Sequence, residues 1–179
     1  MTKLEQLLSQ YAAYHLDHKN ILTHFIGIPL IVFAILCLTE RAGFVLSGME
    51  LTLALGLIVV TTIYYFSLDR IFAFIMLIVL FAAYPLALKI AHLELMAWLS
   101  LSVGIFVVGW LFQFVGHFYE KKKPAFMDDI IGLAIGPLFV LAEMVFMLGF
   151  RKELEQRMLD HAHVLRAEMD SKPISITPN

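Results

Sequence analysis

The chain begins with an amphipathic stretch. Its apolar residues and histidines recur at helical spacing, while polar residues such as Lys3 and Glu5 lie off this stripe. The pattern predicts one face of a helix, and a helix with so polar a second face lies on a membrane surface rather than crossing it. We therefore interpret residues 1–24 as an interfacial helix. The stripe consists of Leu4, Leu7, Leu8, Tyr11, His15 and His18.

Four apolar runs follow, separated by short polar stretches, and each predicts a membrane-spanning helix. A helix needs about 20 residues to cross the roughly 30 Å hydrocarbon core. The first run has 14 residues, so we expect it to recruit residues between Asn20 and His24. The runs are Phe25–Leu38, Leu51–Phe66, Ile71–Leu88 and Leu95–Val115.

A fifth run, Ile130–Phe150, is long enough to span but contains Gly136-Pro137 and Glu143. Proline kinks a helix, and an ionisable group in a membrane is a functional-site candidate. The predicted fold class is thus all-α: a polytopic helical membrane protein with an N-terminal amphipathic helix, four spanning helices and a bent or re-entrant fifth. The transmembrane domain covers 25–150, a polar tail helix 151–170 and a disordered tail 171–179.

Composition agrees with a lipid environment. Apolar residues make up 60% of the 179 residues and charged residues 16%, with a mean hydropathy of +0.83. Ordinary soluble domains have roughly 45–50% apolar residues and about 25% charged residues. A single cysteine, Cys37, excludes a disulfide-rich module. The net charge of −2 and the single basic run, Lys121–Lys123, argue against nucleic-acid binding.

The distribution of basic residues predicts the orientation. With four full spans and a cytoplasmic N-terminus, the cytoplasmic segments hold Lys3, Lys19, Arg70 and Lys121–Lys123, and the other side holds Arg41 and Lys89. The tail from Arg151 onward is also rich in basic residues, which favour the cytoplasmic side. We therefore expect the fifth segment to return the tail to the cytoplasm. We expect an integral protein of a bacterial inner membrane, or of the endoplasmic reticulum in a eukaryote.

Two polar constellations interrupt the apolar background, at 14–24 and 113–125, and this topology places both at the cytoplasmic interface. His15 and His18 are three residues apart, so one helix could present both to an ion. His24 lies half a turn out of phase with His15, and the two converge only if the helix breaks. Asn20 is a plausible break because Asn is a favoured N-cap.

In the second constellation, His117 and Glu120 are three residues apart, so Glu120 could orient a ligating imidazole. Several histidines converging at one face suggest a metal site, because imidazole is the commonest metal ligand. The alternative is that each ring, being half apolar, simply favours the interface. His92 is excluded because it lies at the opposite face, and His161 and His163 suit a solvated tail helix.

At these residues the sequence resembles the 2-hydroxy fatty acid dioxygenases of the fatty acid α-oxidation type. The first motif is carried by Tyr14-His15, Asn20, His24 and Gly27-Ile28-Pro29. The second, more specific motif is carried by Trp110, Gln113-Phe114, Gly116-His117, Glu120-Lys121, Lys123-Pro124-Ala125 and Asp128, and a third patch runs from Gly136 to Glu143. Asp129 departs from the family, which commonly has Asn at this position.

The resemblance implies an Fe(II) enzyme that uses O2 to shorten a long-chain 2-hydroxy fatty acid by one carbon. The α-hydroxy carboxylate could chelate iron, and the substrate supplies all four electrons, so neither 2-oxoglutarate nor NADPH is needed. The family's four-histidine requirement points to His15, His24 and His117, with His18, at a variable position, as the fourth candidate. Supporting catalytic roles fall to Glu120, Asn20 and Tyr14. We expect membrane lipid to surround the protein.

Three other functions fit the pattern of apolar runs. A small transporter or channel could use Glu143 and the broken fifth helix to line a path. A haem or electron-carrier protein would use histidines as axial ligands. A non-catalytic membrane scaffold would bind no metal.

Overall fold

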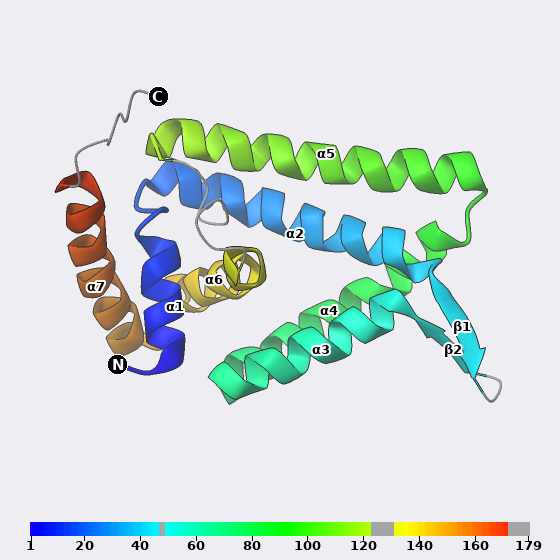
Figure 1. Ribbon diagram of the computed structural model, residues 1–179, viewed down its shortest axis with the longest axis horizontal. Helices are drawn as coiled ribbons and strands as arrows, with labels where there is room; N and C mark the ends of the chain where they lie inside the picture. The colour runs from blue at the N-terminus through cyan, green and yellow to red at the C-terminus, as the bar shows by residue number, and fades with distance from the viewer. Residues whose placement is uncertain (47–48, 123–130, 172–179) are drawn as a thin grey trace, which may run out of the picture.

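The structure, a computed structural model, describes residues 1–46, 49–122 and 131–171. These residues form seven helices and one antiparallel hairpin (Figure 1). The helices are α1 (Lys3–Ala12), α2 (His18–Glu40), α3 (Leu53–Leu68), α4 (Arg70–Ala91), α5 (Leu95–Glu120), α6 (Ile131–Met147) and α7 (Lys152–Ser171), and the strands are β1 (Gly43–Leu46) and β2 (Met49–Thr52).

The N-terminal region breaks into two helices. A capping box closes the start of α1, where the backbone of Glu5 donates to the hydroxyl of Thr2 and the backbone of Thr2 donates to the carboxylate of Glu5. Helix α2 begins after Asp17, whose side chain accepts from the backbone of Lys19 at 2.7 Å. The expected break is therefore present, but Asp17 rather than Asn20 provides the N-cap. Asn20 lies buried in the first turn of α2.

Helices α2 and α5 run antiparallel and form the most extensive helix pair (Figure 1). Glycines allow this close approach. A Cβ on Gly27 would lie 2.7 Å from the carbonyl oxygen of Gly109, and a Cβ on Gly116 would lie 2.3 Å from Oδ1 of Asn20. The pairing brings the start of α2 next to the end of α5, so residues about 100 positions apart in the sequence become neighbours.

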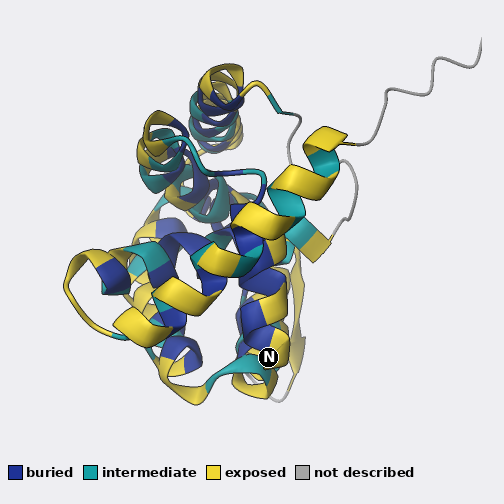
Figure 2. Ribbon diagram, turned by 90° about the vertical axis from the view of Figure 1, so that its left-hand side faces the viewer, coloured by how far each residue is buried: buried dark blue, intermediate teal, exposed yellow. Residues whose placement is uncertain are grey.

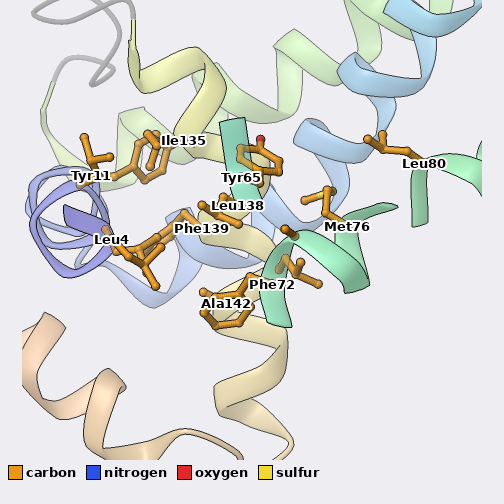
Figure 3. Packing of buried hydrophobic residues seen from close by; sticks show 14 of the residues in the cluster. Leu4, Tyr11, Tyr65, Phe72, Met76, Leu80, Ile135, Leu138, Phe139 and Ala142 are labelled. Carbon is orange, nitrogen blue, oxygen red and sulfur yellow. The ribbon is translucent and has the colours of Figure 1, made fainter. Parts of the chain in front are cut away.

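Helix α6 supplies much of the core (Figure 3). Its Phe139 lies 4.9 Å from the ring of Tyr11 in α1, and its Phe146 lies 6.5 Å from the ring of Phe72 in α4. The hydroxyl of Tyr65 in α3 donates to the α6 carbonyl of Ala134 at 2.6 Å. Helix α6 therefore ties the N-terminal helix to the α3–α4 pair.

Three helices, α2, α4 and α5, are long and apolar enough to cross a membrane. The α3 and α6 helices are also apolar but have 16 and 17 residues, about 24–26 Å of rise, which falls short of the core thickness. Many large apolar residues of the long helices are exposed. Figure 2 shows that exposed positions recur along the helical ribbons. The all-α class is confirmed, with three candidate spanning helices among the described residues, and four spans with a re-entrant fifth stay a prediction.

The hairpin was not predicted. The apolar run beginning at Leu51 was expected to be helical throughout, but Leu51 and Thr52 belong to strand β2. Helix α3 begins only at Leu53, because the Thr52 hydroxyl accepts from the backbone of Leu55 and acts as its N-cap. This boundary shortens the second predicted span.

The polar tail helix packs on the N-terminal helix instead of standing apart in solvent. Arg157 in α7 lies 2.8 Å from the carboxylate of Glu5, and this pairing buries Glu5 although it was expected on the exposed face of α1. Arg151 similarly lies 2.8 Å from Asp69 at the α3–α4 turn. The tail thus shares one end of the structure with α1. The predicted disordered tail, apart from Ser171, lies outside the described residues.

Candidate metal centre

Three histidines meet at the junction of α1, α2 and α5. The ring centroids of His15 and His24 are 4.6 Å apart, those of His15 and His117 5.0 Å, and those of His24 and His117 5.2 Å. One ring nitrogen from each lies within 4.8 Å of the other two. His15 and His24 are 1% exposed and His117 is 8% exposed. The three imidazoles therefore form a compact cluster that is almost completely shielded from water.

The backbone fixes how two of these rings are protonated. Nδ1 of His15 lies 2.6 Å from the carbonyl oxygen of Tyr11, and Nδ1 of His24 lies 2.9 Å from that of Asn20. Because a carbonyl only accepts, each Nδ1 carries the proton and each Nε2 keeps its lone pair. Burial lowers the pKa of His15 well below its usual value, so this ring is neutral at pH 7. Neutral imidazole is the form that binds metals.

The inward nitrogens have no partner among the described residues: Nε2 of His15, Nε2 of His24 and Nδ1 of His117. Buried polar atoms in native proteins are nearly always paired. Two Nε2 lone pairs face into the cluster, and an electron-pair acceptor between them would satisfy both. Imidazole nitrogens suit Fe, Zn, Cu and Ni ions. The residues present therefore fit a transition-metal ion bound by His15, His24 and His117.

Glu120 supports this junction in a different way from the one predicted. We expected it to orient His117, its neighbour on α5. Its Oε2 instead accepts from the backbone of Asp17 at 2.8 Å and from Nδ2 of Asn20 at 3.1 Å. The backbone carbonyl of Asn20 accepts from Nδ1 of His24 and so orients the His24 ring. By binding Asn20, the Glu120 carboxylate therefore fixes the residue that orients His24.

Arg166 is a site-supporting residue that the sequence did not reveal. Its guanidinium donates to Oε1 of Glu120 at 2.6 Å and to the carbonyl of Ala13 at 2.9 Å. Glu120 is therefore held from both sides, by α7 through one oxygen and by α2 through the other. One arginine among several basic residues of a polar helix carries no sequence signal for this role, because its partners lie far away in the chain.

The structure does not bring His18 into the cluster. The chain break before α2 makes His18 the first residue of a new helix, where it is exposed, whereas His15 is buried. The two histidines therefore do not share a helix face as expected. Tyr14 is half-buried in the connecting turn, and its backbone carbonyl lies 3.4 Å from Nδ2 of Asn20. The second motif is described as far as Lys122, and its residues from Lys123 to Asp128 lie outside the described part of the chain.

Comparison with known proteins shows the family of the chain. Residues 1–148 match the family model described as "2-hydroxy-palmitic acid dioxygenase Mpo1-like". The chain belongs to the Mpo1-like family. It is 34% identical over 156 residues to a Saccharomyces cerevisiae protein named 2-hydroxy-palmitic acid dioxygenase MPO1, with 85% of each chain covered. No solved structure matches the chain significantly.

The Mpo1-like match confirms the family resemblance inferred from the two histidine motifs. It includes all three clustered histidines, Glu120 and the whole of α6. Helix α7 begins at Lys152, beyond the matched residues, yet contributes Arg166. The histidine cluster of this Mpo1-like protein is thus supported partly by a segment outside the region that the family model matches.

Proposed function

We propose that this chain is a membrane Fe(II)-dependent dioxygenase that shortens long-chain 2-hydroxy fatty acids by one carbon. The overall reaction is R–CH(OH)–COOH + O2 → R–COOH + CO2 + H2O. The substrate loses four electrons and O2 gains four, so the equation balances without 2-oxoglutarate or NADPH. The relative's printed activity gives the substrate class. The observation that carries the proposal is the convergence of three imidazoles whose inward nitrogens are unpaired among the described residues.

In this proposal His15, His24 and His117 hold the iron, and the other residues keep them in place. Fe(II), when bound, supplies the electron-transfer chemistry that makes O2 reactive towards a closed-shell substrate. The carbonyls of Tyr11 and Asn20 hold two rings with their lone pairs inward. The Tyr11 ring stacks on His15 at 4.1 Å and 5°, which covers one face of this imidazole and excludes water.

The location follows from the apolar helices. We place the site at the cytoplasmic interface of the membrane, because α1 and α7 lie at one end of the α2–α5 pair (Figure 1) and the predicted cytoplasmic lysines, Lys3 and Lys19, lie on α1 and at the start of α2. An interfacial site suits an amphiphile whose carboxylate prefers water while its chain prefers lipid.

The test is turnover by purified protein in lipid nanodiscs. Protein loaded with Fe(II) should convert 2-hydroxypalmitate and O2 to the fatty acid one carbon shorter and CO2, in equal amounts, without added 2-oxoglutarate or NADPH. Palmitate should be inert, because it lacks the hydroxyl oxygen, and because its conversion to the same products would release six electrons, two more than one O2 accepts. Failure to convert either acid, in protein shown to hold iron, would contradict the enzyme assignment and favour transport or a scaffold role.

A further inference from the structure

An apolar cavity of about 240 Å³ begins at the histidine cluster and extends between α2, α5 and α6. Tyr11, Gln113 and His117 form its head, and Ile35 and Phe106 line it farther along the same helices. Phe106 lies about three helical turns from His117, so the cavity follows the helices for roughly 16 Å. The cavity is therefore apolar along most of its length and has its polar side chains next to the histidine cluster.

The polar group at the head of the cavity is the amide of Gln113, whose nitrogen has no hydrogen-bond partner among the described residues. Nε2 of Gln113 is buried and makes no hydrogen bond to any described residue, and the side chain as a whole is 6% exposed. Gln113 lies one helical turn before His117, so its amide is next to the cluster. A buried donor in a native protein is expected to have an acceptor, and here a ligand can provide it.

The cavity also reaches the outer surface of the helices. Ile35 and Leu133 both line it, yet they are 37% and 50% exposed. A second apolar cavity of about 210 Å³, between α2, α3, α4 and α6, shares Ile35 and Leu133 with the first, as well as Val32 and Pro137. These four shared residues, Val32, Ile35, Leu133 and Pro137, form the dividing wall between the two cavities.

We propose that the first cavity binds the acyl chain of the substrate, and that Gln113 donates a hydrogen bond to the oxygens at its head. This inference rests on the proposed function for the identity of the substrate. The complementarity is chemical: the carboxylate and hydroxyl oxygens meet an unpaired donor beside the histidines, and the hydrocarbon meets apolar side chains. The dividing wall then limits how long a chain the first cavity accepts.

Photo-crosslinking tests the occupant independently of turnover. The probe is 2-hydroxypalmitate with a diazirine near its methyl end, added to metal-free protein in phosphatidylcholine nanodiscs. Labels should map to α2 and α5 near Ile35 and Phe106, and unlabelled 2-hydroxypalmitate should compete. The methyl ester of the probe has no charged carboxylate and should label about tenfold less. Gln113→Leu should weaken labelling by the acid about 10–100-fold, as expected for a lost hydrogen bond to a charged group, and remove the preference for acid over ester.

The chain-length profile of the iron-loaded enzyme gives the second readout. Ile35→Trp fills the far part of the cavity and should shift the ratio of C12 to C16 turnover at least tenfold towards the shorter acid. Ile26→Trp is the matched control, because Ile26 is on the same helix, is 48% exposed and does not line the cavity. This control should keep the original profile.

The two experiments separate the acyl-chain site from the reaction. Specific labelling in the cavity without turnover would overturn the proposed function and keep a fatty-acid site. Turnover combined with labelling elsewhere, or with an unchanged chain-length profile in Ile35→Trp, would overturn the cavity assignment and keep the enzyme. Equal labelling by acid and ester in the unmodified protein would show that the cavity holds lipid chains without recognising the head, which also overturns it.

Discussion

The guanidinium of Arg166 lies 2.6 Å from the carboxylate of Glu120, 46 residues earlier in the chain. The Glu120 side chain is 1% exposed and that of Arg166 is 19% exposed, so the pair is largely shielded from water. The same carboxylate accepts a hydrogen bond from the backbone of Asp17 at the start of α2, next to the histidine cluster. The C-terminal helix thus reaches the candidate site through one ion pair.

We predict that Arg166→Met destabilises the protein strongly. Breaking a buried ion pair leaves an uncompensated charge and costs about 3–5 kcal/mol. Lys152→Met is the matched control on the same helix, because Lys152 pairs with Glu155 and the two side chains are 57% and 25% exposed. An exposed pair contributes about 0–1 kcal/mol. Thermal unfolding in detergent compares the two, and equal losses of stability would show that the Arg166 pair is not special.

Glu120→Gln should lower iron affinity or turnover roughly 10–100-fold, as for other residues that orient metal ligands. The amide replaces one acceptor oxygen with a donor, so it cannot satisfy both Asp17 and Arg166 as the carboxylate does. Glu153→Gln is the control, since its side chain is 94% exposed on α7. Iron content and initial rates measure the effect. A Glu120→Gln enzyme with normal iron and normal rates would exclude an orienting role.

Single alanine substitutions of the clustered histidines should each remove most of the bound iron while leaving the protein in the membrane. Each ring offers one inward nitrogen, and the loss of one leaves two ligands. His18→Ala and His92→Ala should retain iron, because neither belongs to the cluster. Elemental analysis of the purified variants decides this. Loss of iron from His18→Ala would restore His18 as a fourth ligand and contradict its exposed position.

Gly116→Ala should separate α2 from α5 and displace Asn20. A Cβ at this position would lie 2.2 Å from Oγ1 of Thr23 and 2.3 Å from Oδ1 of Asn20, so the helices must shift. Overpacking of this kind costs about 1–3 kcal/mol. Gly104→Ala is the control within α5, because no atom lies within 4 Å of the position that the new Cβ would occupy. Alanine has a higher helix propensity than glycine, so this variant should be slightly more stable than the unmodified protein. Unfolding temperatures and iron content should fall only for Gly116→Ala.

The membrane orientation is tested by labelling introduced cysteines in closed vesicles. Cys37 is buried and is first replaced by Ala to remove background. A cysteine at Lys3 should react from the cytoplasmic face, and one at His92, the C-cap of α4, from the other face. Reaction of both from the same face would refute the orientation deduced from the basic residues.

The sequence singled out four candidate ligands, because histidines interrupting apolar runs are conspicuous. The structure brings His15, His24 and His117 together and leaves His18 exposed. The sequence also required a break between His15 and His24, and the structure has one. It did not predict that Asp17 caps the second helix, because Asp17 and Asn20 are both good N-caps.

The sequence did not predict which side chains far apart in the chain form ion pairs with each other. Arg166 is one of several basic residues on a polar helix, and no periodicity indicates that it reaches Glu120 instead of solvent. The β1–β2 hairpin was missed for a related reason. Its second strand continues without a polar break into the apolar run of α3, so hydrophobicity alone gave no boundary at Leu53.

The partly exposed lining of the first cavity has a kinetic consequence. Ile35 and Leu133 line the cavity and are partly exposed, so in the proposed membrane enzyme a fatty acid would enter without leaving the bilayer. The quantity that sets occupancy is then the mole fraction of substrate among the lipids, not its amount per volume of buffer. Adding phospholipid at fixed total 2-hydroxypalmitate should slow the enzyme by surface dilution, whereas diluting the whole suspension with buffer should leave the rate per enzyme nearly constant.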